Sequence, residues 1–362
     1  MIIGSGFGGA AAAYSLICRG VRDILILEKE DAPGRHASGL NTAMARFVAS
    51  NADQLPLVRE GIRFLQGPPE GFPSGPFFRR CGSLMLAEGG EAEQLRGALG
   101  LWQRAGIPTR WIDAEEVVRL APATQGGHFD GAIHCPEDGV ADSARLLDAY
   151  LLAATAAGAR LLTRRRVVSI VTAGGRISAV ETEHERIETS TIVNAAGAWA
   201  NQVAMLAGAT PFPLRALKRH LVLTTAPEGF DSNGPFVRDM SHQLYVRPEA
   251  PGLLMSPCDS SEQPPGGVSV DPRALESLSS KLKQWLPRLA NVSIGTAWAG
   301  LQTMTPDGNM VVGPDPRIRG FIWCAGLGGI GVATSAAVGR MTAAAVLGEP
   351  SLPAHAPGRM AA

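Results

Sequence analysis

Apolar and small residues follow a distinctive order over the first 30 positions. The apolar pair Ile2-Ile3 precedes a glycine cluster at residues 4–9, and helix-favouring alanines follow from Ala10. A second apolar run, residues 24–27, ends at Glu28. This order predicts a strand, a tight turn, a helix and a second strand, which together form the βαβ unit that binds dinucleotides. A pyrophosphate suits the helix N-terminus, and the carboxylate at position 28 suits an unphosphorylated ribose, which argues against NADP.

Apolar runs and helical periodicities continue along the rest of the chain. We predict strands at residues 81–87, 161–162, 167–171, 191–193, 214–225, 243–247, 252–256 and 321–324. We predict helices at residues 91–105, 114–120, 141–158, 275–289 and 332–347. Asp142 is placed to cap the third of these helices. Residues 31–50 are expected to form a loop and the opening of a helix.

Elements of the nucleotide-binding type recur at the start, middle and end of the chain. With 362 residues the chain is long enough for two domains. We therefore predict an α/β fold with an interrupted Rossmann-type domain and a second, mainly antiparallel-sheet domain. Residues 1–50, 137–210 and 303–362 are assigned to the nucleotide-binding domain, and residues 51–136 and 211–302 to the substrate domain.

Charge and cysteine content exclude several classes of function. Lysine plus arginine and aspartate plus glutamate both number 33, so the net charge is zero and no basic stripe points to nucleic acid. The five cysteines are scattered, without metal-ligand spacing, and an odd number argues against a disulfide framework. Residues 320–339 are uncharged, but their central glycines favour a buried strand, turn and helix over a membrane span. We expect a cytoplasmic protein with no metal.

Several segments, in their order along the chain, resemble the FAD-dependent D-amino acid oxidase superfamily. They are the glycine cluster with Glu28, PGRHASG, CPEDGVAD, VNAAGAWANQVAMLAG, WAGLQTMTPDGNMVVG and GLGGIGVATSAAVG. This superfamily includes glycine oxidase, sarcosine oxidase and D-amino acid dehydrogenases, and FLQGPPEGF, WAGL and IGVATSAAVG are most similar to its D-arginine dehydrogenase branch. The resemblance implies FAD as the cofactor and hydride transfer to flavin from a carbon that bears an amine.

The resemblance also implies a set of cofactor contacts. The residues expected to bind FAD are Gly4, Gly6, Gly9, Glu28, Lys29, Arg35, His36, Ala37, Ser38, Val167, Ala196, Gly197, Gly329, Ile330 and Gly331. The late glycine turn, at residues 326–331, would lie against the flavin, with the last helix directing its positive N-terminus at the ring. His36 lies in a segment similar to that of dimethylglycine dehydrogenases, which bind flavin covalently through this histidine. Gly300 replaces the cysteine that sarcosine oxidase uses, so we expect noncovalent FAD and leave attachment through His36 open.

The catalytic residues implied by the resemblance are Tyr245, Arg219, Gln302 and Arg46. Tyr245 and Arg219 match pocket-lining residues of related enzymes. The WAGL motif normally continues with an arginine that binds the substrate carboxylate, but Gln302 stands there and brings no charge. Arg46 lies on a loop near the flavin, where it could replace that charge or pair with the pyrophosphate.

The expected reaction is oxidation of the C–N bond of an amino acid to an imine, with D-amino acids as the leading substrate class. D-Arginine is not expected, because Gly82-Ser83 replaces the glutamate that binds its guanidinium, and the pocket histidine and tyrosine fall on Met44 and Ala49. The alternatives are an N-methyl amino acid oxidase of the sarcosine type and a 2-hydroxy acid oxidase with His220 as the base. A third alternative is a catalytically silent FAD-binding subunit of a hetero-oligomer. Oxygen and a quinone both remain open as the electron acceptor.

Overall fold

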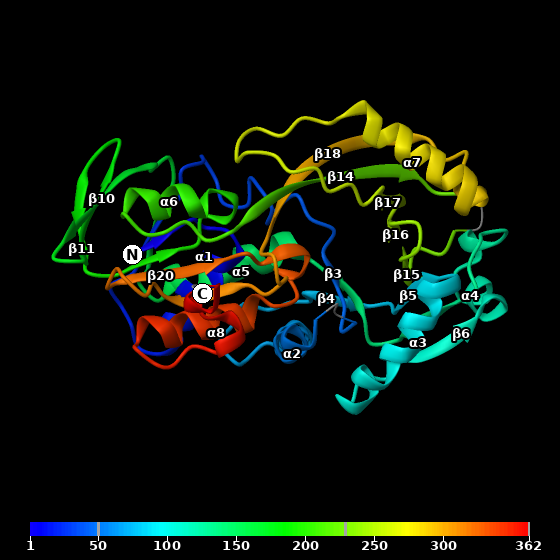
Figure 1. The fold of residues 1–362 in the computed structure, drawn as a ribbon, viewed down its shortest axis with the longest axis horizontal. Helices are drawn as coiled ribbons and strands as arrows, with labels where there is room; N and C mark the ends of the chain where they lie inside the picture. Colours follow the sequence, from blue (N-terminus) through cyan, green and yellow to red (C-terminus); the bar gives the residue numbers. More distant parts are fainter. Residues whose placement is uncertain (49–50, 228–229, 361–362) are drawn as a thin grey trace.

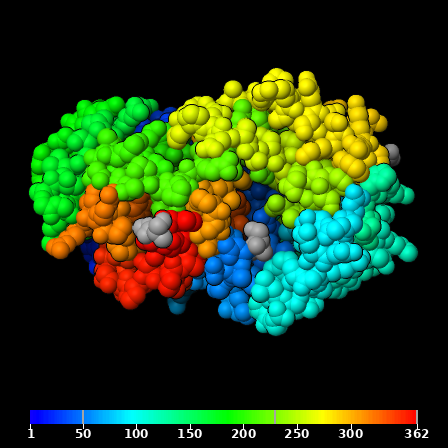
Figure 2. Space-filling view, viewed as in Figure 1, coloured from blue at the N-terminus to red at the C-terminus, as the bar shows by residue number. Residues whose placement is uncertain are grey.

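The computed structural model describes residues 1–48, 51–227 and 230–360, and Ala49 of the predicted pocket lies outside these ranges. In these ranges the chain forms an elongated body with one large sheet toward each end (Figures 1 and 2). Its α-helices are α1 (Phe7–Cys18), α2 (Leu55–Gln66), α3 (Gly89–Arg104), α4 (Ala114–Leu120), α5 (Ser143–Ala156), α6 (Ala200–Leu206), α7 (Pro272–Trp285) and α8 (Ser335–Val346).

The nucleotide-binding sheet has six strands in the order β19-β20-β13-β1-β2-β9. They are β19 (Val311–Pro314), β20 (Phe321–Ala325), β13 (Ile192–Asn194), β1 (Ile2–Ile3), β2 (Leu25–Leu27) and β9 (Arg160–Leu162). All neighbours are parallel except β19 and β20. These strands are short apolar runs, as expected of parallel strands covered on both faces.

Helices cover one face of this sheet, and a small sheet with α6 covers the other. The helices α1, α5 and α8 pack together over one face, where Ile2 and Ile26 join their core. On the opposite face, Ile3 and Leu27 pack with α6 and with the three-stranded sheet β10-β11-β12. The strands of that sheet are β10 (Val167–Ala173), β11 (Arg176–Thr182) and β12 (Arg186–Glu188). The carboxyl ends of the parallel strands are thus left open for a ligand.

The second large sheet has eight strands in the order β18-β14-β17-β16-β15-β5-β7-β6. They are β18 (Ile294–Met304), β14 (Arg215–Thr225), β17 (Gly252–Ser256), β16 (Leu244–Glu249), β15 (Phe236–Asp239), β5 (Ser83–Ala87), β7 (Gly131–Cys135) and β6 (Arg110–Asp113). Only β15 and β5 are parallel neighbours. The helices α4 and α7 pack on one face through Val117, Leu278 and Leu282. The long strands β14 and β18 extend from this sheet toward the nucleotide-binding end (Figure 1).

A second three-stranded sheet and α2 complete the fold. This second sheet has the order β3-β8-β4, with β3 (Met44–Ala45), β8 (Gly139–Ala141) and β4 (Phe78–Arg80). Helix α2 packs against α8 and the residues just before it, where a Cβ added at Gly61 would lie 1.8 Å from the carbonyl oxygen of Ala333. Helix α2 belongs to the range assigned to the substrate domain, but it contacts α8, which belongs to the range assigned to the nucleotide-binding domain. The domain boundary at residue 50 stays a prediction.

The sequence predictions of fold class and most elements are confirmed. The helix predicted at residues 114–120 has those bounds, and Asp142 caps α5 by accepting a hydrogen bond from the Arg145 amide at 3.0 Å. The prediction that a helix opens within residues 31–50 is wrong for its described part, which forms loop and the short strand β3. The helix predicted to reach residue 289 ends at Trp285, because Pro287 begins a separate 3₁₀ turn.

Two further features concern the whole of the described chain. The five cysteines are all unpaired. None of the described helices combines the length and apolar character needed to cross a bilayer. Residues 320–339 instead form β20, a glycine turn and the start of α8, as predicted from their glycines.

Candidate cofactor and substrate site

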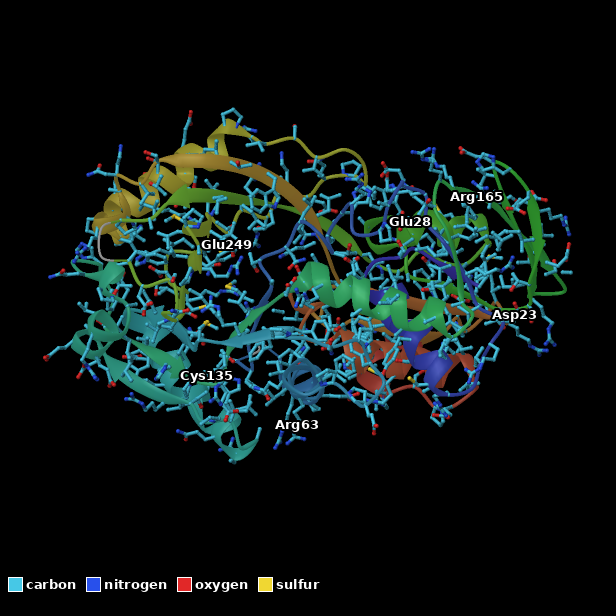
Figure 3. The ribbon with its side chains drawn as sticks, turned by 180° about the vertical axis from the view of Figure 1, so that it is seen from behind. Asp23, Glu28, Arg63, Cys135, Arg165 and Glu249 are labelled. Carbon is cyan, nitrogen blue, oxygen red and sulfur yellow. The ribbon has the colours of Figure 1, made fainter. Side chains whose placement is uncertain are left out.

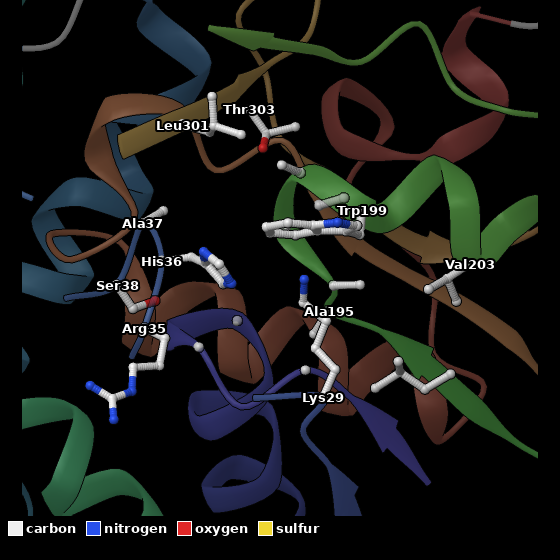
Figure 4. A pocket seen from close by; sticks show the side chains of 18 of the residues that line it. Lys29, Arg35, His36, Ala37, Ser38, Ala195, Trp199, Val203, Leu301 and Thr303 are labelled. Atoms are coloured by element: carbon white, nitrogen blue, oxygen red, sulfur yellow. The ribbon is translucent and has the colours of Figure 1, made fainter. Parts of the chain in front are cut away.

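A cavity of about 820 Å³ lies at the carboxyl ends of β1, β2, β13 and β20. This volume is within the roughly 300–1,000 Å³ usual for ligand sites. Residues from the two large sheets line it, including Glu28 after β2. Leu301 and Thr303 of β18 also line it (Figure 4). Seen from behind, Glu28 and Arg165 lie at the nucleotide-binding end of the molecule, and Cys135 and Glu249 lie at the other end (Figure 3).

The glycine turn packs tightly between β1, β13 and α1. Gly4 has a φ of +101°, and a Cβ there would lie 2.5 Å from the carbonyl oxygen of Ala195. A Cβ at Gly9 would lie 1.9 Å from the carbonyl oxygen of Gly4, so this glycine permits close packing of helix and strand rather than lining the cavity. A Cβ at Gly6 would lie 2.8 Å from Ser38 Oγ, which accepts a hydrogen bond from the Phe7 amide at 3.0 Å. Gly6 and Ser38 therefore form the floor of the cavity at the N-terminus of α1.

The Glu28 carboxylate is fixed at the edge of the cavity. Its Oε2 accepts hydrogen bonds from the Ser5 amide at 3.0 Å and the Ser5 hydroxyl at 2.6 Å. Its Oε1 accepts from the Glu30 amide at 3.0 Å. Glu28 is 8% exposed, and the carboxylate has acceptor capacity left, so it can accept hydrogen bonds from ribose hydroxyls.

Aromatic and charged side chains form one wall of the cavity (Figure 4). Lys29 Nζ lies 3.3 Å from the centroid of the Trp199 ring, and the centroid of the His36 ring lies 4.5 Å from that of Trp199. His36 Nε2 lies 2.8 Å from Glu30 Oε1. Arg35 also lines the cavity, but its guanidinium is held at the surface by Asp31. This wall offers stacking and hydrogen-bonding groups to a nucleotide.

The predicted cofactor residues fall into two sets by position. Eleven of them line the cavity: Gly4, Gly6, Glu28, Lys29, Arg35, His36, Ala37, Ser38, Val167, Ala196 and Gly197. Gly9, Gly329, Ile330 and Gly331 do not line it. Gly326, Leu327 and Gly328 line it in place of the three later residues, because the turn enters a 3₁₀ helix at Gly328 that carries the following residues away. The sequence prediction also missed Trp199, Arg165 and Gly300 as lining residues, although the GAW and WAGL motifs contain two of them.

The register of β14 and β18 brings Arg219 and Gln302 to one face of the second sheet. Arg219 lies opposite Gly300, and Leu217 lies opposite Gln302. Opposed residues and residues two apart share a face of a sheet. A Cβ at Gly329 would lie 3.3 Å from Gln302 Nε2, so the amide lies beside the late glycine turn. Gly300 lines the cavity through its backbone, but neither Arg219 nor Gln302 is among the lining residues. The side chains of β18 that line it, Leu301 and Thr303, alternate to the other face of the strand.

Tyr245 occupies the same face. The register places Ser256 between Tyr245 and Leu221, and Leu221 shares its face with Arg219 two residues away. Tyr245 is 4% exposed. Burial raises the pKa of the phenol, with a smaller contribution from Cys258, while a hydrogen bond from Ser256 and the charge of Arg219 act against that rise. Three of the four predicted catalytic residues, Tyr245, Arg219 and Gln302, are thus on one face.

Arg46 approaches this face from the loop after β3. Burial lowers the pKa of its guanidinium to about 9, and the neighbouring charge of Arg238 contributes to the fall, while Asp138 opposes both effects. Asp138 accepts hydrogen bonds from the Phe47 amide and the Ser83 hydroxyl, each at 2.6 Å. Burial raises the pKa of Asp138 to about 6 despite these bonds. The sequence prediction missed Asp138, although it lies in the CPEDGVAD motif, and it missed Arg238, for which no motif gave a signal.

His220 is held on the opposite face of β14. Its Nδ1 lies 2.7 Å from Asp259 Oδ2, and its Nε2 accepts a hydrogen bond from the Asp271 amide at 2.9 Å. Both ring nitrogens are therefore in use, and the residue is 1% exposed. This histidine anchors the loop between β17 and α7, whose Gly266, Gly267 and Val268 line the cavity.

The fold and the cavity define a flavin-dependent oxidoreductase of the DAO type. The family described as "FAD dependent oxidoreductase" (DAO) matches residues 1–345, and the chain belongs to it. The residues fit FAD, because Gly6 leaves room at the helix N-terminus that a Cβ would fill and Glu28 presents acceptors for a ribose. FAD is the cofactor of this family.

Individual relatives differ in what they do. The mitochondrial pyruvate dehydrogenase phosphatase regulatory subunit of Mus musculus is 28% identical over 95% of this chain and 40% of its own length. The mitochondrial sarcosine dehydrogenase of Mus musculus is 26% identical over 92% of this chain and 38% of its own length. The chain therefore spans less than half the length of these curated relatives. The structure of iminodiacetate oxidase from Chelativorans sp. BNC1 matches with a TM-score of 0.79 and 26% identity, covering 97% of this chain and 95% of that chain.

Proposed function

We propose that this protein oxidises the C–N bond of an amino acid to an imine, with D-amino acids as the leading substrate class. The observation that carries the proposal is the shared sheet face of Arg219, Tyr245 and Gln302, of which Gln302 lies beside the glycine turn that borders the cofactor cavity. Bound FAD would supply the hydride acceptor. The protein's own groups would bind the carboxylate and orient the substrate C–H bond.

Each side chain has a distinct role in this proposal. Arg219 supplies the positive charge for the substrate carboxylate, because Gln302 replaces the arginine usual for the motif. The Tyr245 phenol, kept protonated by burial, donates a hydrogen bond to the same carboxylate. The Gln302 amide lies beside Gly329, where it can donate to a carboxylate oxygen or accept from the amine.

D-Arginine is a poor candidate for this pocket. Its guanidinium would meet the charges of Arg238 and Arg46, and Ser83 already donates its hydroxyl to Asp138. Asp138 itself is buried and uses its oxygens on Ser83 and Phe47. An unpaired, desolvated guanidinium costs several kcal/mol.

Specific observations favour or disfavour each alternative function. An N-alkyl amino acid substrate is supported by the relatives named for sarcosine and iminodiacetate, both secondary amines. A 2-hydroxy acid oxidase is disfavoured, because both nitrogens of His220 are already bonded on the far face of β14. A silent FAD-binding subunit is supported by Gln302 in place of arginine and by a relative that is named as a regulatory subunit.

Anaerobic flavin reduction tests the proposal directly. We expect the visible flavin absorbance to bleach with at least one member of a panel of D-, L- and N-methyl amino acids. If no member of the panel bleaches a fully FAD-loaded protein, the silent-subunit alternative is favoured.

Arg219→Ala tests the role of the carboxylate anchor. We expect the KM of the best substrate to rise by roughly 10- to 150-fold, the equivalent of about 1.5–3 kcal/mol for a hydrogen bond to a charged group. FAD content should not change. The matched control is Arg215→Ala on the same strand, since Arg215 pairs with Glu262 at the surface. Unchanged KM in Arg219→Ala would contradict the pocket.

A further inference from the structure

Three half-buried arginines lie around Tyr245 without an ion-paired carboxylate among the described residues. Arg46, Arg219 and Arg238 form no ion pair with any aspartate or glutamate in the described ranges, whereas Arg247 pairs with Glu249 and Arg215 with Glu262. The Nε of Arg219 is buried and has no hydrogen-bond partner among the described residues. All three arginines act electrostatically on the Cys258 thiol, so their charges converge on one region.

Two of these charges reach Tyr245 from opposite sides. Strands β14 and β15 lie on opposite sides of β16, which carries Tyr245. Arg238 of β15 lies directly opposite Tyr245, and Arg219 of β14 lies beyond β17 on the other side. With about 4.8 Å between neighbouring strands, and with Arg219 two residues along β14 from the position in line with Tyr245, the backbones of Arg219 and Arg238 are roughly 16 Å apart. Two separate positions for an anion therefore flank the phenol.

Arg46 belongs to the Arg238 side. Arg238 is the neighbouring charge that most lowers the pKa of Arg46, so the two guanidinium groups destabilise each other as cations. The carboxylate that opposes this effect is Asp138, whose oxygens are already bonded to Phe47 and Ser83. Burial of unpaired charge is costly unless a partner supplies the opposite charge.

We infer that the substrate carries a second carboxylate, which binds between Arg238 and Arg46 while the first binds Arg219 and Tyr245. The inference rests on the proposed oxidation of an amino acid at this site and names its substrate class, an amino or imino dicarboxylate. A dicarboxylate supplies two negative charges to three arginines, whereas an ordinary amino acid leaves the Arg238 side unpaired. Because no described carboxylate forms an ion pair with Arg46 or Arg238, and the oxygens of Asp138 already accept from Phe47 and Ser83, the second carboxylate is a determinant of specificity.

Two matched substrate pairs test the inference. Iminodiacetate and sarcosine are both secondary amines and differ by one carboxylate, and D-aspartate and D-alanine are primary amines that also differ by one carboxylate. We expect kcat/KM to favour the dicarboxylate in at least one pair by roughly 10- to 150-fold, the worth of a hydrogen bond to a charged group. The pair that responds identifies the class of amine. Equal values within both pairs would overturn the inference.

Arg238→Gln assigns the second carboxylate to its site. We expect this variant to lose most of the preference for the dicarboxylate while the matched monocarboxylate keeps its kcat/KM. Arg46→Gln should also lower the preference for the dicarboxylate over the monocarboxylate, which provides a second variant if Arg238→Gln fails to fold. The control Arg215→Gln, in a surface ion pair on β14, should keep the wild-type preference. An equal loss for both members of a pair would contradict a separate second position.

A binding measurement separates this inference from the proposed reaction. Diglycolate has the two carboxylates of iminodiacetate with an ether oxygen in place of the amine, and methoxyacetate has one carboxylate. Calorimetry on the FAD-loaded protein should show tighter binding of diglycolate than of methoxyacetate in wild type, and no such difference in Arg238→Gln. If that difference is found but no amine reduces the flavin, the proposed oxidation fails and the dicarboxylate site stands. If amines reduce the flavin without any dicarboxylate preference, the proposed oxidation stands and the dicarboxylate site is contradicted.

Discussion

Single residues at the cavity floor decide whether the cofactor can bind. Gly6 faces Ser38 Oγ, which in turn accepts from the Phe7 amide at the start of α1. We expect Gly6→Val to displace Ser38 and fill the pyrophosphate position, so the purified variant should lose most of its FAD. The ratio of flavin to protein absorbance measures the loss. Gly67→Ala is the control, since no atom lies within 4 Å of a Cβ at that position. Full FAD occupancy in Gly6→Val would contradict the assignment of the phosphate turn.

The buried carboxyl group of Asp138 makes the stability of the fold depend on pH. Burial raises its pKa from 3.8 to about 6, so the folded protein binds this proton more tightly than the unfolded chain does. The stability contributed by this group is therefore present at low pH and is lost as the pH rises from about 4 to about 6. In Asp138→Asn the amide side chain cannot titrate and keeps an acceptor for the Phe47 amide. We expect the melting temperature of this variant, relative to wild type, to rise across that interval and level off above it; a constant difference would contradict the raised pKa.

Contacts between helices hold the cavity in shape. Helix α8 crosses α1 at Gly339, where a Cβ would lie 2.4 Å from the carbonyl oxygen of Ala11. Gly339→Ala should therefore separate the two helices and lower the free energy of unfolding by about 1–3 kcal/mol. Gly97→Ala is the matched control within α3, where a Cβ meets no atom within 4 Å and alanine should stabilise the helix by about 1 kcal/mol. Denaturant unfolding checks both, and equal effects in the two variants would contradict the crossing.

Patterns in the local sequence predicted individual helices and strands better than they predicted which strands pair. The helix at residues 114–120 and the Asp142 cap follow from nearby residues alone, and both are confirmed. The prediction for residues 31–48 was wrong, because their short strand β3 exists only through pairing with β8, which lies far along the chain. A strand of two residues has no periodicity of its own, so its sequence carries no signal for it.

Over the whole molecule, the motifs predicted the cofactor cavity and left the substrate side incomplete. Eleven of the fifteen predicted cofactor residues line the cavity, because glycine turns and strand ends carry local signals. Arg238 and Asp138 were missed, since their positions beside Tyr245 and Arg46 depend on register and on loop packing between sheets. Resemblance transfers positions that match a motif, and Arg238 lies in none.

The surroundings of His36 favour noncovalent binding of FAD. His36 Nε2 is directed to Glu30, its ring lies beside Trp199, and Gly300 offers no nucleophile. We therefore expect acid precipitation to release the FAD and leave the denatured polypeptide without flavin fluorescence. Flavin that remained on the polypeptide in wild type but not in His36→Ala would instead establish attachment through His36.

The released cofactor should also bind again and stabilise the protein. Because the cavity is built from the ends of four strands of one sheet and from β18 of the other, FAD binds the folded state and not the unfolded chain. Mass action then predicts that free FAD at about 100 times its Kd raises the free energy of unfolding by about 2.7 kcal/mol. Thermal melting of the apoprotein over a series of FAD concentrations measures this rise. If FAD did not change the melting temperature of the apoprotein, and Gly6→Val and wild type had the same melting temperature, the cofactor would bind outside the cavity.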